Sequence, residues 1–316
     1  MKICIAGAAG AFGMKHLDAV RNIDGIEVHS VVGRDAEKMA AFAKDNNIPH
    51  AFTELDDALA QPELDAVILA TPTQVHASQA IACLKAGKHV MVEIPMADNI
   101  DDARELVKVQ KETGLVAMAG HTRRFNPSHQ WIHDKIQKGE LKVQQMDVQT
   151  YFFRRSNKNA LGQERSWTDH LLWHHACHTV DLFQYQVGER ASKLQALQGP
   201  IHPTLGIAMD MSIGMKVPSG AICTLSLSFN NEGPFGTFFR YICDNGTYIA
   251  RYDDLVDGNE NPVDLSGVAV SNNGIELQDR EFFAAIKEGR EPNASVAQCL
   301  PAMESLNTLE QLLEAE

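Results

Sequence analysis

Met1-Lys-Ile-Cys-Ile-Ala-Gly-Ala-Ala-Gly-Ala-Phe-Gly13 is the stretch that decides the fold. Its apolar run Lys2–Ala6 predicts a buried strand, and Ala11–Val20 predicts a helix. The glycines between them predict a tight turn that lets a ligand approach the backbone, with the first helical N–H groups facing a pyrophosphate. A ligand-free turn is the alternative. The residues expected to bind a dinucleotide here are Gly7, Gly10, Ala11, Phe12 and Gly13.

Buried strands and helices then alternate as far as residue 120. The expected strands are 26–32, 65–70, 89–92 and 115–119, and the expected helices are 35–45, 75–86 and 100–113. Strands without polar alternation, separated by helices, indicate a parallel sheet covered on both faces. We therefore expect an α/β fold whose residues 1–121 form a doubly wound, NADP-binding Rossmann domain.

The pattern changes after residue 121. Helices are expected at 127–138, 170–186, 276–288 and 296–313, and strands at 143–153, 235–243 and 247–250. Two alternating runs, 207–217 and 221–230, are joined by the turn Pro218-Ser-Gly220 and predict a hairpin with a methionine stripe in the core. Residues 122–316 are thus expected to form an α+β domain with a largely antiparallel sheet, for substrate binding and dimerisation.

Charge and cysteine content exclude several classes of protein. The chain has 316 residues and a formal net charge of −13, which argues against nucleic acid and anionic membranes as partners. Its six cysteines form no C-x-x-C pair, as is typical of reduced thiols in a cytoplasmic protein. No signal peptide or long apolar span is evident.

The end of the second strand bears on the choice of cofactor. It reads Val32-Gly33-Arg34-Asp35. An acidic residue here usually binds the ribose 2′-OH of NAD, whereas an arginine can pair with the 2′-phosphate of NADP. We expect Arg34 to select NADP, with NAD and Asp35 as the alternative.

Polar loops follow the next three strands, at the sheet edge where a dinucleotide binds. Thr71-Pro72-Thr73-Gln74-Val75-His76 follows one strand, Glu93-Ile94-Pro95 the next, and His121-Thr-Arg-Arg-Phe-Asn126 the last. Each could be an ordinary loop, but three together on one edge indicate a site. The residues therefore expected to contact the cofactor are Thr71, Pro72, Thr73, His76 and Glu93.

Histidines are concentrated between Trp167 and Asp181. On a regular helix His170, His174 and His178 fall on one face. One imidazole could be a general base, because an ordinary histidine pKa suits proton removal near neutral pH. The same spacing is compatible with zinc, and interior hydrogen-bonded histidines are the third interpretation. We favour the base and expect no metal, because hydride transfer needs a proton acceptor.

Arginines form a second set, and their number in so acidic a chain suggests a small substrate with carboxylates bound bidentately. Each could also be a solvated surface residue, and Arg124 is favoured because it follows the fifth strand. The set comprises Arg123, Arg124, Arg154, Arg155, Arg165 and Arg240.

The whole chain resembles the glucose–fructose oxidoreductase / inositol dehydrogenase (Gfo/Idh/MocA) family. The matching features are the glycine turn, Thr71-Pro-x-x-x-His76, Glu93-x-Pro95 and the helix containing His178-Thr-Val-Asp181. The family's catalytic lysine is replaced by Ile94, and the usual aspartate four residues before His178 by His174. The resemblance implies an NAD(P)-dependent dehydrogenase and, as is common in the family, a homodimer. The implied catalytic residues are His178 as base and His174 as its partner or substitute, with the sequence leaving His174, His175 and His178 all open as the base. Glu93 and the 71–76 loop are expected to hold the nicotinamide ribose.

Within the family, four long stretches resemble dehydrogenases that oxidise the cyclic hemiacetal of a dicarboxylic aldehyde in aromatic-compound catabolism. They are 121–127, 144–155, 165–175 and 238–246. They imply NADP-linked oxidation of a small dicarboxylate bound by Arg123, Arg124, Arg155, Trp167 and His175. A sugar or polyol dehydrogenase, a metal-dependent hydrolase and a non-catalytic NADP sensor remain alternatives.

Overall fold

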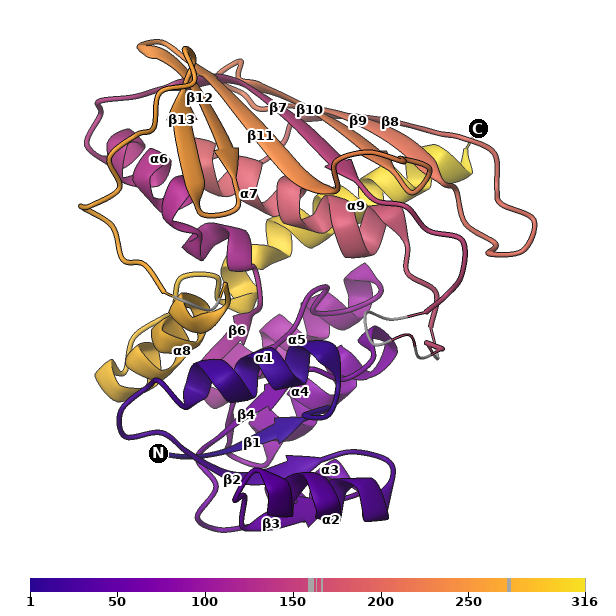
Figure 1. Cartoon of the computed structure of the whole chain (residues 1–316), viewed down its shortest axis with the longest axis vertical. Helices are drawn as coiled ribbons and strands as arrows, with labels where there is room; N and C mark the ends of the chain where they lie inside the picture. Colours follow the sequence, from indigo (N-terminus) through magenta and orange to yellow (C-terminus); the bar gives the residue numbers. More distant parts are fainter. Residues whose placement is uncertain (159–161, 163, 166, 272–273, 316) are drawn as a thin grey trace. The chain divides into compact units, whose positions relative to one another are not determined.

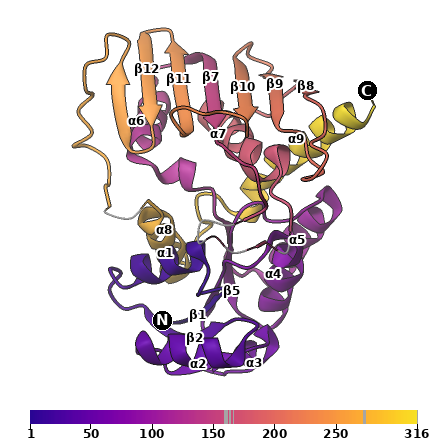
Figure 2. The ribbon, with the colours of Figure 1, turned by 45° about the vertical axis from the view of Figure 1, so that its right-hand side comes forward.

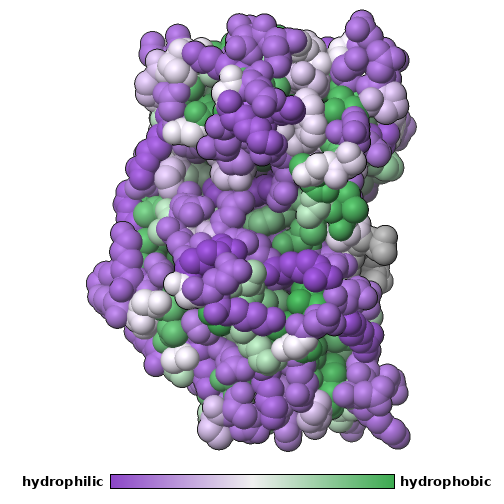
Figure 3. All heavy atoms as spheres, turned by 90° about the vertical axis from the view of Figure 1, so that its left-hand side faces the viewer, coloured by the Kyte–Doolittle hydropathy of each residue, from purple (hydrophilic) through white to green (hydrophobic). Residues whose placement is uncertain are grey.

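The structure is a computed structural model that describes residues 1–158, 162, 164–165, 167–271 and 274–315. The chain divides into two compact units (Figure 1). Unit 1 comprises Met1–Thr122, Asn159–Trp167 and Ser271–Leu300, and unit 2 comprises Arg123–Lys158, Thr168–Val270 and Pro301–Glu316. Among the described residues, no helix has the length and hydrophobicity needed to cross a membrane. The face seen in Figure 3 is mostly hydrophilic, with smaller apolar areas.

Unit 1 is built on a six-stranded, wholly parallel sheet in the order β3-β2-β1-β4-β5-β6. The strands are β1 (Lys2–Ala6), β2 (Glu27–Val32), β3 (His50–Phe52), β4 (Ala66–Leu69), β5 (His89–Val92) and β6 (Ala117–Ala119). Every residue of β4 is buried, as expected for a strand covered on both faces. This order, which reverses between β1 and β4, confirms the predicted Rossmann fold.

The helices of unit 1 connect these strands. They are α1 (Ala11–Val20), α2 (Ala36–Asp45), α3 (Leu55–Leu59), α4 (His76–Lys85) and α5 (Ile100–Thr113), with the 3₁₀ turn η1 (Thr73–Val75) before α4. From the other end of the chain, α8 (Glu276–Glu288) packs against α1. The sequence-based division at residue 121 does not anticipate that this late segment belongs to unit 1.

The turn after β1 depends on the absence of side chains at Gly7 and Gly13. Gly7 has φ +80°, and a Cβ placed there would lie 2.3 Å from the carbonyl oxygen of Ala70. A Cβ on Gly13 would lie 2.2 Å from the carbonyl oxygen of Gly7. The turn therefore packs directly against the residue that follows β4, and α1 begins immediately after it.

Unit 2 contains a seven-stranded sheet in the order β13-β12-β11-β7-β10-β9-β8, antiparallel except for the β7–β10 pair. The strands are β7 (Val143–Tyr151), β8 (Lys193–Gln198), β9 (Asp210–Lys216), β10 (Ile222–Ser228), β11 (Gly236–Cys243), β12 (Gly246–Arg251) and β13 (Asp254–Asp257). The expected largely antiparallel sheet is confirmed. Met211, Ile213 and Met215 of β9 are buried, as the predicted methionine stripe required.

Helices cover one face of this sheet (Figure 2). They are α6 (Pro127–Gln137), the π-helix η3 (Leu171–Ala176), α7 (Cys177–Val187) and α9 (Val296–Glu314), which begins in unit 1 and continues in unit 2. The 3₁₀ turn η2 (Thr122–Phe125) precedes α6. The opposite face presents polar side chains such as Thr224 and Ser212, both exposed.

Four elements were not predicted: β3, α3, β8 and β13. At three residues β3 is too short to give an apolar run. The edge strand β8 has only one buried residue, Ala196, so its sequence lacks the alternation that marks a half-buried strand. Edge elements of this kind form because a neighbouring strand offers them a hydrogen-bonding partner.

Replacing Gly7 with alanine tests the close approach at the turn. Gly87 is a matched control, because it also has positive φ (+76°) but no atom within 4 Å of the added Cβ. We expect Gly87→Ala to cost about 1 kcal/mol in the free energy of unfolding, the strain of left-handed backbone alone. Gly7→Ala should cost several times more in urea denaturation, because strain and overlap add. Equal losses would show that Ala70 moves away freely.

Candidate active site

The start of α1 offers a ready site for an anion. Its N-cap is Gly10, no side chain caps the helix, and its first turn holds no acidic residue. The first backbone N–H groups of any helix have no partner within the helix. Here no side chain caps them, while Phe12 beside them is half exposed. The residues present therefore fit the pyrophosphate of a dinucleotide.

The two residues after β2 have different surroundings. Asp35 is the N-cap of α2, and its carboxylate accepts a hydrogen bond from the backbone N–H of Lys38 at 3.1 Å. That hydrogen bond, together with the nearby Lys38 amine, lowers the pKa of Asp35. Arg34 is exposed, and no carboxylate of the described residues pairs with it. Of the two residues, Arg34 is the one whose charge is available to a ligand.

The loop after β4 is held to the loop after β5 by a buried histidine. Nδ1 of His76 lies 2.8 Å from the carbonyl oxygen of Pro95, and Nε2 lies 2.8 Å from that of Thr71. The Thr71 hydroxyl donates to Oε1 of Gln79 at 2.6 Å. Pro72 precedes η1, where Thr73 is buried. These contacts give the predicted cofactor loop a fixed backbone, a role for His76 that is at least partly structural.

Glu93 directly follows β5 and is almost buried, with 9% of the residue exposed. Its Oε1 accepts a hydrogen bond from Nε2 of His16 at 3.0 Å. Nδ1 of His16 faces both carboxylate oxygens of Asp279, each at 3.0 Å. Glu93 is therefore a carboxylate fixed at the edge of the sheet where the cofactor loops lie.

The predicted helix with three histidines on one face is wrong in its first part. His170 is extended (φ −119°, ψ 135°) and lies outside the helix, followed by the π-helix η3 and then α7. A π-helix has a wider turn than an α-helix, so residues four apart no longer align. The α-helical geometry behind the zinc alternative is therefore absent from this described segment.

His174 has a defined tautomer. Its Nδ1 accepts a hydrogen bond from the backbone N–H of His170 at 2.9 Å. Because a backbone amide only donates, this bond requires an unprotonated Nδ1 and places the ring proton on Nε2. Burial lowers the pKa of His174 to about 3, in spite of the nearby carboxylate of Asp169. His174 is thus a neutral hydrogen-bond donor near neutral pH.

His175 and Arg154 share one carboxylate. Nε2 of His175 lies 2.9 Å from Oδ1 of Asp169, and Arg154 forms an ion pair with the other oxygen. The His175 ring packs edge-on against Phe229, over which the Arg154 guanidinium also stacks. This cluster fixes His175 and neutralises Arg154.

Arg124 makes a buried, bidentate ion pair with Asp181. Its Nε donates to Oδ2 at 2.8 Å and its Nη2 to Oδ1 at 2.6 Å, and the guanidinium stacks on Tyr185. Only 4% of Arg124 is exposed. The fork of Arg124 already holds a carboxylate of the chain itself, which counts against the expectation that it clamps a substrate carboxylate.

Arg123 and Arg155 differ from Arg124 in lacking a carboxylate partner among the described residues. Arg123 stacks on Tyr252, and burial lowers its pKa. Arg155 is exposed and donates to the main-chain carbonyls of Arg154 and Phe229. Neither forms an ion pair with a carboxylate of the described residues, although Asp253 lies near enough to Arg123 to act on its pKa.

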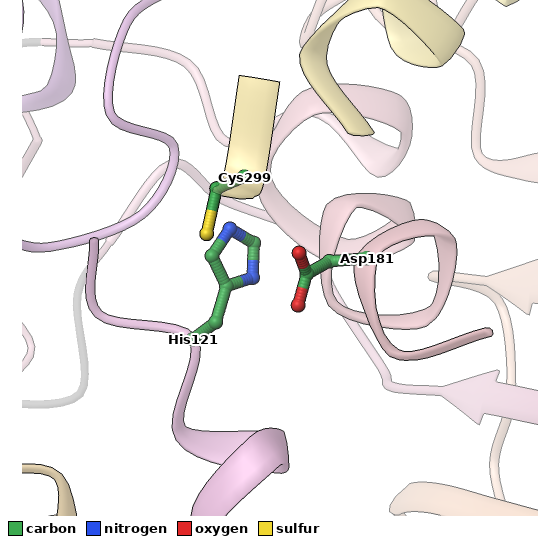
Figure 4. Close-up of side chains that lie close together, drawn as sticks. All are labelled: His121, Asp181 and Cys299. Atoms are coloured by element: carbon green, nitrogen blue, oxygen red, sulfur yellow. The ribbon is translucent and has the colours of Figure 1, made fainter. Parts of the chain in front are cut away.

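Other candidates are distributed between the units. Trp167 belongs to unit 1, where Arg165 stacks on its ring, whereas His174, His175 and His178 belong to unit 2. His178 lies half-buried in the first turn of α7. Figure 4 shows His121 and Cys299, both of unit 1, with a ring nitrogen and the sulfur within 4.8 Å, and Asp181 on α7 of unit 2. One histidine and one cysteine are too few ligands for a zinc site within unit 1.

Sequence reasoning missed three polar residues: His16, Asp279 and Asp169. The first two were detectable, because each occupies a buried helix position next to apolar residues. His16 lies beside Leu17 and Val20, and Asp279 beside Phe282. A charged residue on the core face of an amphipathic helix is unusual enough to indicate a buried partner.

Comparison with known proteins identifies the class. Residues 1–121 match the model "Oxidoreductase family, NAD-binding Rossmann fold", and residues 127–269 match "Bacterial oxidoreductases, C-terminal". The chain belongs to the Gfo/Idh/MocA oxidoreductase family and is an NAD(P)-dependent dehydrogenase. It is 66% identical over 316 residues, all of both chains, to the 4-carboxy-2-hydroxymuconate-6-semialdehyde dehydrogenase of Sphingobium sp. (strain NBRC 103272 / SYK-6).

Other relatives are more distant. The chain is 35% identical to the 1,5-anhydro-D-fructose reductase of Ensifer adhaerens over 125 residues. This match covers 40% of this chain and 37% of that relative. An oxidoreductase from Agrobacterium radiobacter, solved with NAD⁺, L-tartaric acid and magnesium, has the same fold. Its TM-score is 0.84 at 16% identity, over 99% of this chain and 96% of that one.

Proposed function

We propose that this dehydrogenase oxidises the cyclic hemiacetal of 4-carboxy-2-hydroxymuconate-6-semialdehyde to 2-pyrone-4,6-dicarboxylate, using NADP⁺, in the protocatechuate 4,5-cleavage route. The observation that carries the proposal is the 66% identity, without gaps in coverage, to a dehydrogenase of that name. The bound cofactor would accept a hydride from the hemiacetal carbon. The protein must then bind two substrate carboxylates and remove the proton of the hemiacetal hydroxyl.

The cysteines support a hemiacetal over a free aldehyde as the reacting form. An aldehyde is commonly oxidised through a covalent thiohemiacetal, which needs a reactive thiolate. All six cysteines are buried thiols. Burial raises the pKa of Cys4 and of Cys243 to about 12. A cyclic hemiacetal already carries the hydroxyl that is oxidised, so it needs no such nucleophile.

His178 is our proposed base. A base works best when its pKa is near the working pH, which counts against His174 with a pKa of about 3. His175 is engaged by Asp169, which Arg154 shares. We assign His174 the role of a neutral donor that orients the substrate, with Glu93 at the nicotinamide end of the cofactor.

Arg155 and Arg123 are proposed to bind the substrate carboxylates, and His175 and Trp167 are proposed as further substrate contacts. The support is electrostatic: neither arginine has a carboxylate partner among the described residues, whereas Arg124 and Arg154 do. Guanidinium groups bind carboxylates through paired hydrogen bonds, which suits a dicarboxylate better than a neutral sugar.

We further propose that the protein is a homodimer formed through the open face of the seven-stranded sheet. That face is polar overall but contains Leu197 and Ile222, which are 64% and 37% exposed. Large apolar side chains among hydroxyl groups are compatible with an interface between two copies.

The reaction is tested with the ring-cleavage product of protocatechuate, generated enzymatically, together with NADP⁺ or NAD⁺. We expect formation of reduced nicotinamide, followed by absorbance, and of 2-pyrone-4,6-dicarboxylate, identified by mass. If NADPH binds but neither cofactor is reduced, the hemiacetal assignment is wrong. A polyol substrate or a sensor function would then account for the fold.

Arg34→Ser tests cofactor selection. Loss of a charged hydrogen bond to the 2′-phosphate should raise the KM for NADP⁺ about tenfold or more and leave that for NAD⁺ unchanged. Lys44→Ser is the control, because it removes an exposed cation from the last turn of α2, the helix that begins just after Arg34 and Asp35. A parallel rise for both cofactors would mean that the substitution disturbs α2 and not phosphate binding.

His178→Gln tests the base. We expect kcat/KM to fall about 10²- to 10⁴-fold, the usual contribution of general base catalysis, with NADPH affinity retained. His174→Gln keeps a donor at that position, so we expect a smaller loss. The pH–rate profile of His174→Gln should keep the wild-type shape. Near-wild-type turnover in His178→Gln would remove it as the base.

A further inference from the structure

Unit 1 contains a buried cluster of three ionisable side chains that come from distant parts of the sequence. His16 lies on α1, Glu93 after β5 and Asp279 on α8. His16 and Asp279 are completely buried. Isolated charges are so costly to bury that such groups occur only when paired and hydrogen-bonded.

A protonated His16 fits this geometry. Both of its ring nitrogens lie 3.0 Å from carboxylate oxygens, and only an imidazolium can donate from both. Burial lowers the pKa of His16, but the adjacent Asp279 and Glu93 outweigh burial and raise it to about 10. With Glu276 also facing Asp279, the cluster has one cation among several carboxylates.

The surroundings leave one position for the Glu93 carboxylate. A Cβ on Gly120, which follows β6, would lie 2.8 Å from its Oε1. The amide of the buried Gln278 lies 3.5 Å from the same oxygen. Among the described residues no hydrogen bond reaches Oε2. One oxygen is thus held by α1 and α8, and the other remains to accept a donor.

The location of Glu93 indicates which donor. In a doubly wound sheet the two halves of a dinucleotide lie on either side of the point where strand order reverses. That point is between β1 and β4, and Arg34 follows β2 on one side of it. Glu93 follows β5 on the other side, the nicotinamide half.

We propose that His16 and Asp279 are positioning residues, which hold the Glu93 carboxylate for a hydrogen bond from the nicotinamide riboside. The inference rests on the proposed NADP-dependent function, because it assigns a role within the cofactor site. It differs from a purely structural role, since only binding of the nicotinamide half depends on it.

The test compares NADPH with 2′,5′-ADP, which has the adenosine half and 2′-phosphate but no nicotinamide riboside. Calorimetric titration of each into wild type, His16→Gln, Asp279→Asn and Gly120→Ala is done without substrate. We expect NADPH to bind about tenfold more weakly to all three variants, and 2′,5′-ADP to change less than twofold. Asp18→Asn, an exposed substitution on α1, should change neither.

Equal weakening of both ligands would overturn the proposal, because it would mean that the cluster merely supports α1. Unchanged NADPH affinity would overturn it as well. If His16→Gln fails to fold by circular dichroism, Glu93→Gln keeps the shape of the carboxylate and must show the same selective loss. If the wild-type protein binds NADH but not NADPH, only the proposed choice of cofactor is refuted. The role of His16 and Asp279 is then tested in the same way with NADH and ADP as the two ligands.

Discussion

The first turn of the chain can form only without side chains at Gly7 and Gly13, and the rest of unit 1 depends on it. The Gly7 backbone sits against Ala70, so β1, β4 and α1 converge with no room for a Cβ. That convergence is the point where strand order reverses. It also leaves the uncapped start of α1 at the edge where the loops after β4 and β5 meet through His76. The fold of unit 1 and its cofactor site thus depend on the same steric constraint, the absence of side chains at Gly7 and Gly13.

Charge pairing then divides similar residues into different roles. Four arginines in two adjacent pairs look equivalent in the sequence, yet Arg124 and Arg154 form ion pairs with aspartates, whereas Arg123 and Arg155 form none with a described residue. The histidines are divided in the same way, since a backbone donor gives His174 a fixed tautomer and Asp169 engages His175. An acidic protein can therefore present positive charge locally where its own carboxylates do not reach.

Local signals predicted most of the fold. The apolar runs of β1, β4 and β5 and the glycine turn are written in consecutive residues, and these elements formed as expected. The edge strands β3 and β8 lack such signals. Long-range pairings were equally invisible: Asp181 is 57 residues from Arg124, and Asp279 is 263 from His16. The π-helix was missed because its sequence is also compatible with an α-helix.

Asp35 gives this chain an unusual link between cofactor preference and stability. Its carboxylate caps α2, and a helix cap contributes about 1 kcal/mol. Turning that carboxylate toward a ribose hydroxyl would leave the start of α2 without its acceptor. A lineage or a designer that recruits an acidic residue here to bind a ribose 2′-hydroxyl must therefore supply a second one, and cannot simply redirect Asp35.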